Sequence, residues 1–146
     1  MRLATPDDAH LILEMMMDCY IENQKEAPRD VGFNVFKARK YIEDAIDSPG
    51  AILYFAPNGV IIATYVDTFW GDNYFLSTSF FYVKPEARNG LLARRMFRLM
   101  EFEAKWRGLK YLVVSPQYKP STTFLDSLLK RIGFEHDGGI YAKHIS

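Results

Sequence analysis

The chain has 146 residues, of which 49% are apolar and 25% charged, and its 18 basic and 18 acidic side chains give a formal net charge of zero. This length and composition predict a single globular domain over residues 1–146. The neutral balance argues against bulk attraction to nucleic acid or an anionic membrane. No apolar run approaches the roughly twenty residues of a membrane span and no signal peptide is visible, so we expect a cytoplasmic protein. Cys19 is the only cysteine, and we interpret it as a small core residue.

The first third of the chain predicts a short edge strand and two helices. Residues 1–5 suit the strand, and a helix over residues 6–22 has Thr5 as its expected N-cap. A polar loop follows, and Asn34 is expected to cap a second helix over residues 35–47. The residues of this second helix expected to face inward are Phe36, Ile42 and Ile46.

The middle of the chain predicts a sheet. Residues 51–56, 60–70 and 74–83 are rich in β-branched and aromatic residues and are separated by short turns, so we expect an antiparallel meander. A long helix from about residue 91 leads to the apolar run 111–114, which we expect to pair parallel to the preceding strand. A last helix to residue 131 and two short strands close the chain. The order βααβββαβαββ predicts an α+β fold with a mixed central sheet.

The stretch from residue 80 to 106 has the layout strand, glycine-containing turn, helix. The first turn of a helix has N–H groups without partners and carries partial positive charge, so it binds phosphate readily. Arg94 and Arg95 lie near this helix end, where the dipole disfavours cations unless an anion is bound. A phosphate site and a solvated basic patch are both compatible with this stretch.

The same stretch resembles the core motif of the GCN5-related N-acetyltransferases, the GNAT superfamily. That motif is a strand ending in V-x-P-x-x-R, followed by a turn of pattern (Q/R)-x-x-G-x-(G/A), and Val83, Pro85, Arg88 and Ala93 match it. The central glycine does not match, because Leu91 occupies its register. The opening RLATPDDAHLI and the late LLKRIGFE also resemble the family. The resemblance implies a sheet of about six to seven strands flanked by about four helices.

The resemblance further implies that acetyl-CoA is the acyl donor and an amine the acceptor. Backbone N–H groups of the turn and helix start would hold its diphosphate, with Arg88 and Arg94 as further phosphate partners. Val83 would offer backbone groups to the pantetheine arm, in a splay between residues 74–83 and 111–114. The implied donor-binding residues are Val83, Arg88, Asn89, Gly90, Leu91, Leu92, Ala93 and Arg94.

The acid and base are less clearly indicated. Leu129 occupies the position where many family members have a tyrosine as general acid, and a leucine cannot donate a proton. Tyr118 in the preceding loop is the candidate substitute, although a packing tyrosine is the simpler interpretation. The strand 74–83 has no carboxylate. The weaker candidates for the base or a proton relay are Glu22, Asp67, Ser77 and Ser79.

Two functions therefore remain. One is an acetyl-CoA-dependent N-acetyltransferase acting on a small molecule, an amino acid or a protein amino group. The other is a catalytically inactive module that binds CoA or a partner protein. The three histidines are far apart without metal-ligand spacing, and nucleotide-binding glycine motifs are absent from the sequence. Aromatic residues around the turn 71–73 could form an acceptor wall or a homodimer contact.

Overall fold

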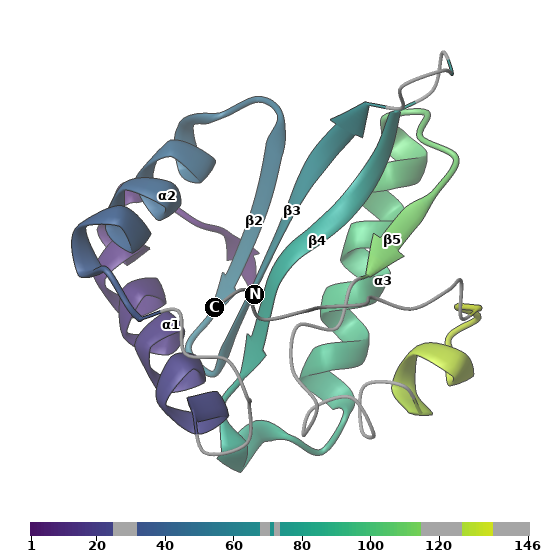
Figure 1. The fold of residues 1–146 in the computed structure, drawn as a ribbon. Coiled ribbons are helices and arrows are strands. Elements are labelled where there is room, and N and C mark those ends of the chain that lie inside the picture. The colour runs from purple at the N-terminus through teal and green to yellow at the C-terminus, as the bar shows by residue number, and fades with distance from the viewer. Residues whose placement is uncertain (25–31, 68–70, 72–73, 115–126, 136–146) are drawn as a thin grey trace, which may run out of the picture.

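The computed structural model describes residues 1–24, 32–67, 71, 74–114 and 127–135. They form a five-stranded sheet in the order β1-β2-β3-β4-β5 with helices on both faces (Figure 1). The elements are β1 (Arg2–Leu3), the 3-10 helix η1 (Pro6–Asp8), α1 (Ala9–Gln24), α2 (Val35–Asp47), β2 (Ala51–Ala56), β3 (Gly59–Asp67), β4 (Tyr74–Val83), the 3-10 helix η2 (Pro85–Ala87), α3 (Leu91–Trp106) and β5 (Leu112–Val114). Residues 127–131 are also helical.

The sheet is mixed, as the sequence predicts. β1 to β4 pair antiparallel with their neighbours, and β5 pairs parallel with β4 after the α3 crossover. The described residues contain five of the six to seven strands expected, and most of the segment expected to form the closing strands lies outside them. Helices α1 and α2 cover one face of the sheet and α3 covers the other, so the core has two layers (Figure 1).

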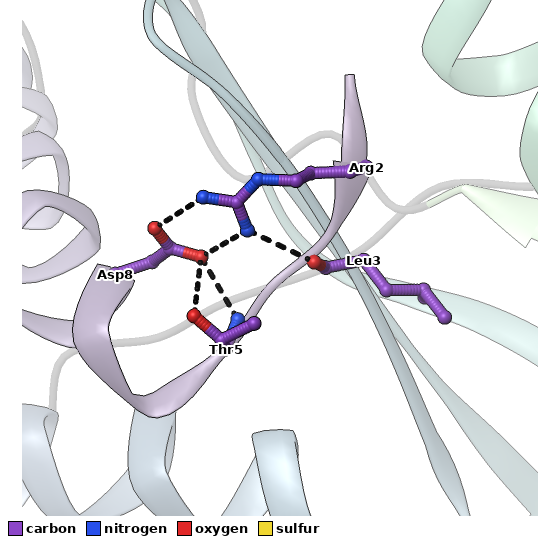
Figure 2. Close-up of polar contacts among 4 residues, drawn as sticks. All are labelled: Arg2, Leu3, Thr5 and Asp8. Carbon is purple, nitrogen blue, oxygen red and sulfur yellow. Dashed lines mark hydrogen bonds and ion pairs between the residues drawn. The ribbon is translucent and has the colours of Figure 1, made fainter.

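The first strand is tied to the first helix by the side chain of Asp8. Both oxygens of this carboxylate accept hydrogen bonds from the Arg2 guanidinium, at 2.6 and 2.8 Å, and Oδ2 also accepts from the Thr5 N–H at 2.8 Å (Figure 2). Asp8 is buried, and the guanidinium lowers the pKa of its carboxyl to about 2. The hydrogen bond from Thr5 confirms the predicted helix start, although its first turn is a 3-10 turn.

The predicted N-cap of α2 is also confirmed, since Asn34 Oδ1 accepts a hydrogen bond from the Lys37 N–H at 3.0 Å. The inward face was predicted correctly at Ile42, which is fully buried. The prediction of an inward-facing side chain was wrong at Phe36, which is 86% exposed. Ala38, Ile42, Ala45 and Ile46 form the packed stripe, and Phe36 lies out of phase with it.

β4 contains a bulge at Ser79. Ile62 of β3 lies opposite Phe80 and Ala63 lies opposite Thr78, so the register shifts by one residue at Ser79. The bulge reverses the alternation of side chains along β4. Phe80 therefore packs in the α1/α2 layer, whereas Thr78 shares the α3 side of the sheet with its neighbour Ala63.

The pairing of β5 with β4 is described for residues 76–78 of β4, and Val114, opposite Thr78, is the last residue described before residue 127. From Phe80 to Val83, none of the described residues forms a strand on the β5 side of β4. The end of β4 leads directly to η2 and the start of α3, where the sequence places its candidate phosphate site.

Candidate functional site

The start of α3 is shaped by Gly90, which has φ of 89° and precedes the first helical residue. This left-handed conformation is accessible to glycine at little cost, and no non-glycine residue among those described adopts a positive φ. Leu91 already belongs to the helix and needs no such freedom. Gly90 lies one residue before the position of the central glycine in the family pattern. It is at Gly90 that this backbone needs the left-handed conformation.

Two of the first N–H groups of α3 have partners within the protein. The Leu91 N–H donates to Asn89 Oδ1 at 3.1 Å, and the Arg94 N–H donates to the Gly90 carbonyl at 3.0 Å. The N–H groups of Leu92 and Ala93 donate to none of the described residues. Together with the dipole of a 16-residue helix, they make this end suitable for an anion.

Arg94 and Arg95 are both exposed in the first turn and a half of α3. Within the described part of the chain, neither forms an ion pair. Two unpaired guanidinium groups at the positive end of a helix are electrostatically unfavourable without an anion nearby. Their placement is consistent with the phosphate interpretation of the sequence.

Arg88 has a different environment. Its Nη1 and Nη2 donate to the two carboxylate oxygens of Glu22 at the end of α1, and its Nε donates to the Val83 carbonyl at 2.9 Å. The guanidinium also lies 5.5 Å from the centre of the Tyr82 ring. Arg88 thus links α1, the end of β4 and the loop before α3, and its charge is balanced by Glu22. The Val83 carbonyl, expected to face the pantetheine arm, already accepts this bond.

The ion pair also determines what Glu22 can do. The hydrogen bonds from Arg88 lower the pKa of the Glu22 carboxyl and raise the pKa of the guanidinium. A carboxylate made more acidic is a poor proton acceptor near neutral pH. Burial raises the pKa of the neighbouring Tyr82 to about 12, and the Glu22 charge acts in the same direction. Tyr82 therefore keeps its proton over the physiological range.

The remaining acid and base candidates do not converge within the described ranges. Leu129 is buried in the α3 layer, and Tyr118 lies outside the described residues. Asp67 is exposed at the end of β3. The Ser79 hydroxyl is hydrogen-bonded to the Tyr41 hydroxyl at 2.7 Å and donates to the Ile62 carbonyl at 3.2 Å, so it supports the bulge.

The described residues offer neither a metal site nor a membrane-spanning helix. Among them, no group of histidine, cysteine, aspartate and glutamate side chains is arranged to hold a metal ion. None of the helices described is both long enough and apolar enough to cross a bilayer. Cys19 is buried and its sulfur accepts a hydrogen bond from Asn23 Nδ2, which confirms its interpretation as a core residue.

Known structures share this architecture over nearly the whole chain. One is a predicted acetyltransferase from Clostridium acetobutylicum solved with acetyl-CoA, with a TM-score of 0.72, 16% identity and coverage of 98% of this chain and 94% of that one. Another is the ribosomal-protein-alanine N-acetyltransferase from Brucella melitensis, with a TM-score of 0.68, 16% identity and coverage of 98% and 97%. The BH1408 protein from Bacillus halodurans has a TM-score of 0.78, 11% identity and coverage of 99% and 98%.

No protein-family model matches the sequence, and no curated protein sequence matches it either. The likeness is therefore one of structure rather than sequence. The chain has the acyl-CoA N-acyltransferase fold of the GCN5-related N-acetyltransferases, as the sequence motifs predicted.

Proposed function

We propose that the protein is an acetyl-CoA-dependent N-acetyltransferase that transfers an acetyl group directly to an amine in a ternary complex. The observation that carries this proposal is the pair of first-turn N–H groups at Leu92 and Ala93, which donate to none of the described residues and lie shortly after the end of β4. The fold, shared with a structure solved with acetyl-CoA, supports the choice of donor.

The donor fits this site in two parts. Its diphosphate would accept hydrogen bonds from the N–H groups of Leu92 and Ala93, with Arg94 adding charge at the same helix end. Its pantetheine arm contains two amides and could pair with the backbone of β4 between Phe80 and Val83, as an added strand would. Arg88 would hold the loop in shape rather than bind phosphate, since Glu22 occupies its guanidinium.

The reaction needs little covalent help from the protein. The nitrogen of a neutral amine attacks the thioester carbonyl carbon, the N–C bond forms and the C–S bond breaks. The amine nitrogen loses one proton to a base, and the leaving thiolate gains one proton. Holding the two reactants together supplies much of the acceleration. We keep Tyr118 as the proposed proton donor, and we propose a small molecule, an amino acid or a protein amino group as the acceptor.

The test is release of free CoA thiol from acetyl-CoA in the presence of a panel of amines, together with thermal stabilisation by acetyl-CoA alone. We expect stabilisation and amine-dependent thiol release. Stabilisation without release for any amine would instead support an inactive CoA-binding module, which the leucine at position 129 favours. Absence of stabilisation would overturn both functions.

A further inference from the structure

Helix α3 exposes large apolar side chains on the face that points away from the sheet. Leu91 is 73% exposed and Phe102 is 61% exposed. The buried residues of the helix, such as Met100, lie on its opposite side. A surface helix normally carries polar residues on its outer face. Large apolar side chains on that face are typical of an interaction surface.

Two arginines complete this outer face of α3. Arg95 and Arg98 lie between the two apolar residues at helical spacing. The four side chains form one line along the helix, which we call the α3 stripe: Leu91, Arg95, Arg98 and Phe102. Both arginines are exposed, and neither forms an ion pair with a described residue. The α3 stripe is therefore basic in the middle and apolar at its two ends.

Helix α1 carries a line of residues with the same pattern and the opposite charge. Its members are exposed, follow one another at helical spacing and lie opposite the buried side of the helix; we call them the α1 stripe: Leu11, Glu14, Asp18 and Ile21. Neither Glu14 nor Asp18 forms an ion pair with a described residue. The α1 stripe is therefore acidic in the middle and apolar at its two ends.

The two stripes match in length and in register when the helices run antiparallel. At a helical rise of 1.5 Å per residue, the α3 stripe extends roughly 16 Å and the α1 stripe roughly 15 Å. The intervals between successive residues are four, three and four along α3, and three, four and three along α1. An antiparallel contact therefore has these opposing pairs: Leu91 with Ile21, Arg95 with Asp18, Arg98 with Glu14, and Phe102 with Leu11. Two pairs of opposite charge lie between two apolar pairs.

The two stripes of one chain cannot meet, because α1 and α3 cover opposite faces of the sheet (Figure 1). We propose that the α3 stripe binds the α1 stripe of a second copy of this chain. Each copy then has one surface of each kind, so the contact is head-to-tail and leads to rings or open chains rather than to a two-fold dimer. A contact between two helix faces is small, so the association is weak. This contact does not depend on the proposed function.

Sedimentation velocity at increasing protein concentration tests the proposal. We expect the wild type to assemble beyond a dimer at low salt and to dissociate at high salt. The α3 variant combines Arg95→Glu with Arg98→Glu, and the α1 variant combines Glu14→Arg with Asp18→Arg. Each variant places like charges opposite one another, so its self-association should be weaker than that of the wild type by roughly tenfold or more.

Charge exchange makes the test specific. An equimolar mixture of the α3 variant and the α1 variant has opposite charges at every contact, and it should associate as the wild type does. A single chain with all four substitutions has the wild-type net charge and should also self-associate. As a matched control, Asp44→Arg combined with Asp47→Arg changes the net charge as much as the α1 variant does, at exposed positions of α2. This control should self-associate like the wild type.

Four results would overturn the proposal. One is a wild-type protein that stays monomeric, in which case the two stripes face partners other than this chain. Another is a wild type that stops at a dimer. The third is an α1 variant that loses no more self-association than the α2 control. The last is a mixture of the two variants that stays monomeric although circular dichroism shows both to be folded.

Discussion

Arg88 and Glu22 form a bidentate ion pair that joins the loop before α3 to the end of α1, 66 residues earlier in the chain. The same guanidinium donates to the Val83 carbonyl at the end of β4. Three elements that border the candidate donor site are thus held by one side chain. Because both partners are about one-third exposed, we expect the pair to matter more for the shape of the loop than for global stability.

The variant Glu22→Gln distinguishes a positioning role of Arg88 from direct phosphate binding. If Arg88 positions the loop, losing its charged partner should weaken acetyl-CoA binding several-fold, even though a negative charge near the site has been removed. If Arg88 binds phosphate, freeing it should strengthen binding. Titration calorimetry at low and moderate salt measures the sign of the change.

A matched control for Glu22→Gln is Asp18→Asn, which removes a nearby exposed carboxylate that does not bond Arg88. We expect this control to bind acetyl-CoA as well as or slightly better than the wild type. A tighter complex with Glu22→Gln than with Asp18→Asn would contradict the positioning role.

Gly59 sets how closely the first half of α3 approaches the sheet. A Cβ at this position would lie 2.9 Å from the Tyr82 carbonyl oxygen, 2.9 Å from Met96 Cε and 3.1 Å from Leu92 Cδ2. Backbone would have to move, so Gly59→Ala should destabilise the protein by about 1–3 kcal/mol. It should also weaken acetyl-CoA binding by displacing the helix start.

Chemical denaturation measures the stability of Gly59→Ala, with Gly50→Ala as its control. A Cβ at Gly50 would meet only Ser48 Oγ, at an ordinary 3.6 Å, so this variant should be close to wild type. Equal stability of the two alanine variants would show that α3 is free to shift away from the sheet.

Asp8 should make stability depend on pH in the acid range. Its carboxyl has a pKa of about 2 in the folded protein, against an ordinary value of 3.8, so the folded state binds the proton less readily. The resulting stabilisation is present above pH 3.8 and is lost as the pH falls toward 2. Since Arg2 is more than half exposed, we expect about 1 kcal/mol rather than the full value of the shift.

Urea unfolding of Asp8→Asn at several pH values measures this contribution. The variant should be less stable than the wild type at neutral pH, and the difference should shrink as the pH approaches 2. Asp7→Asn, at the exposed neighbouring position, should show a smaller difference. A difference for Asp8→Asn that stays constant with pH would contradict the lowered pKa.

Arg94 provides the charge test of the α3 start. Arg94→Glu places an anion beside the N–H groups of Leu92 and Ala93 and should weaken acetyl-CoA binding at least tenfold at low salt. The same change at Arg98, an exposed residue one turn farther along the helix, should have a smaller effect. Direct binding assays at two salt concentrations measure the acetyl-CoA affinity of both variants. Equal losses of affinity would show that the phosphate site is not at the start of α3.

Much of the fold could be predicted from the sequence because its signals are local. The strand-turn-helix layout, the Asn34 cap and the glycine before α3 all depend on neighbouring residues, and the structure confirms each. The bulge at Ser79 could not be predicted. The strand was predicted from its β-branched and aromatic residues, and that composition is the same with or without one extra residue. The wrong prediction at Phe36 has a similar cause, since two helical phases fit the pattern of that segment.

The candidate site was predictable only in part. The sequence indicated the helix start and its arginines, which lie in one continuous stretch. It gave no sign that Arg88 pairs with Glu22, because that contact depends on how α1 packs beside β4. Nor did it indicate that the buried Thr78 hydroxyl has no hydrogen-bond partner among the described residues. The assignment of Tyr118 stays a prediction.

The central claim is that the start of α3 binds the diphosphate of the donor. Titration calorimetry with acetyl-CoA and with S-acetylpantetheine, which has the same acyl arm but no diphosphate, tests it most directly. We expect acetyl-CoA to bind and S-acetylpantetheine to bind at least tenfold more weakly, with the difference falling at high salt. Equal affinity for the two ligands, or no binding of acetyl-CoA, would contradict the claim.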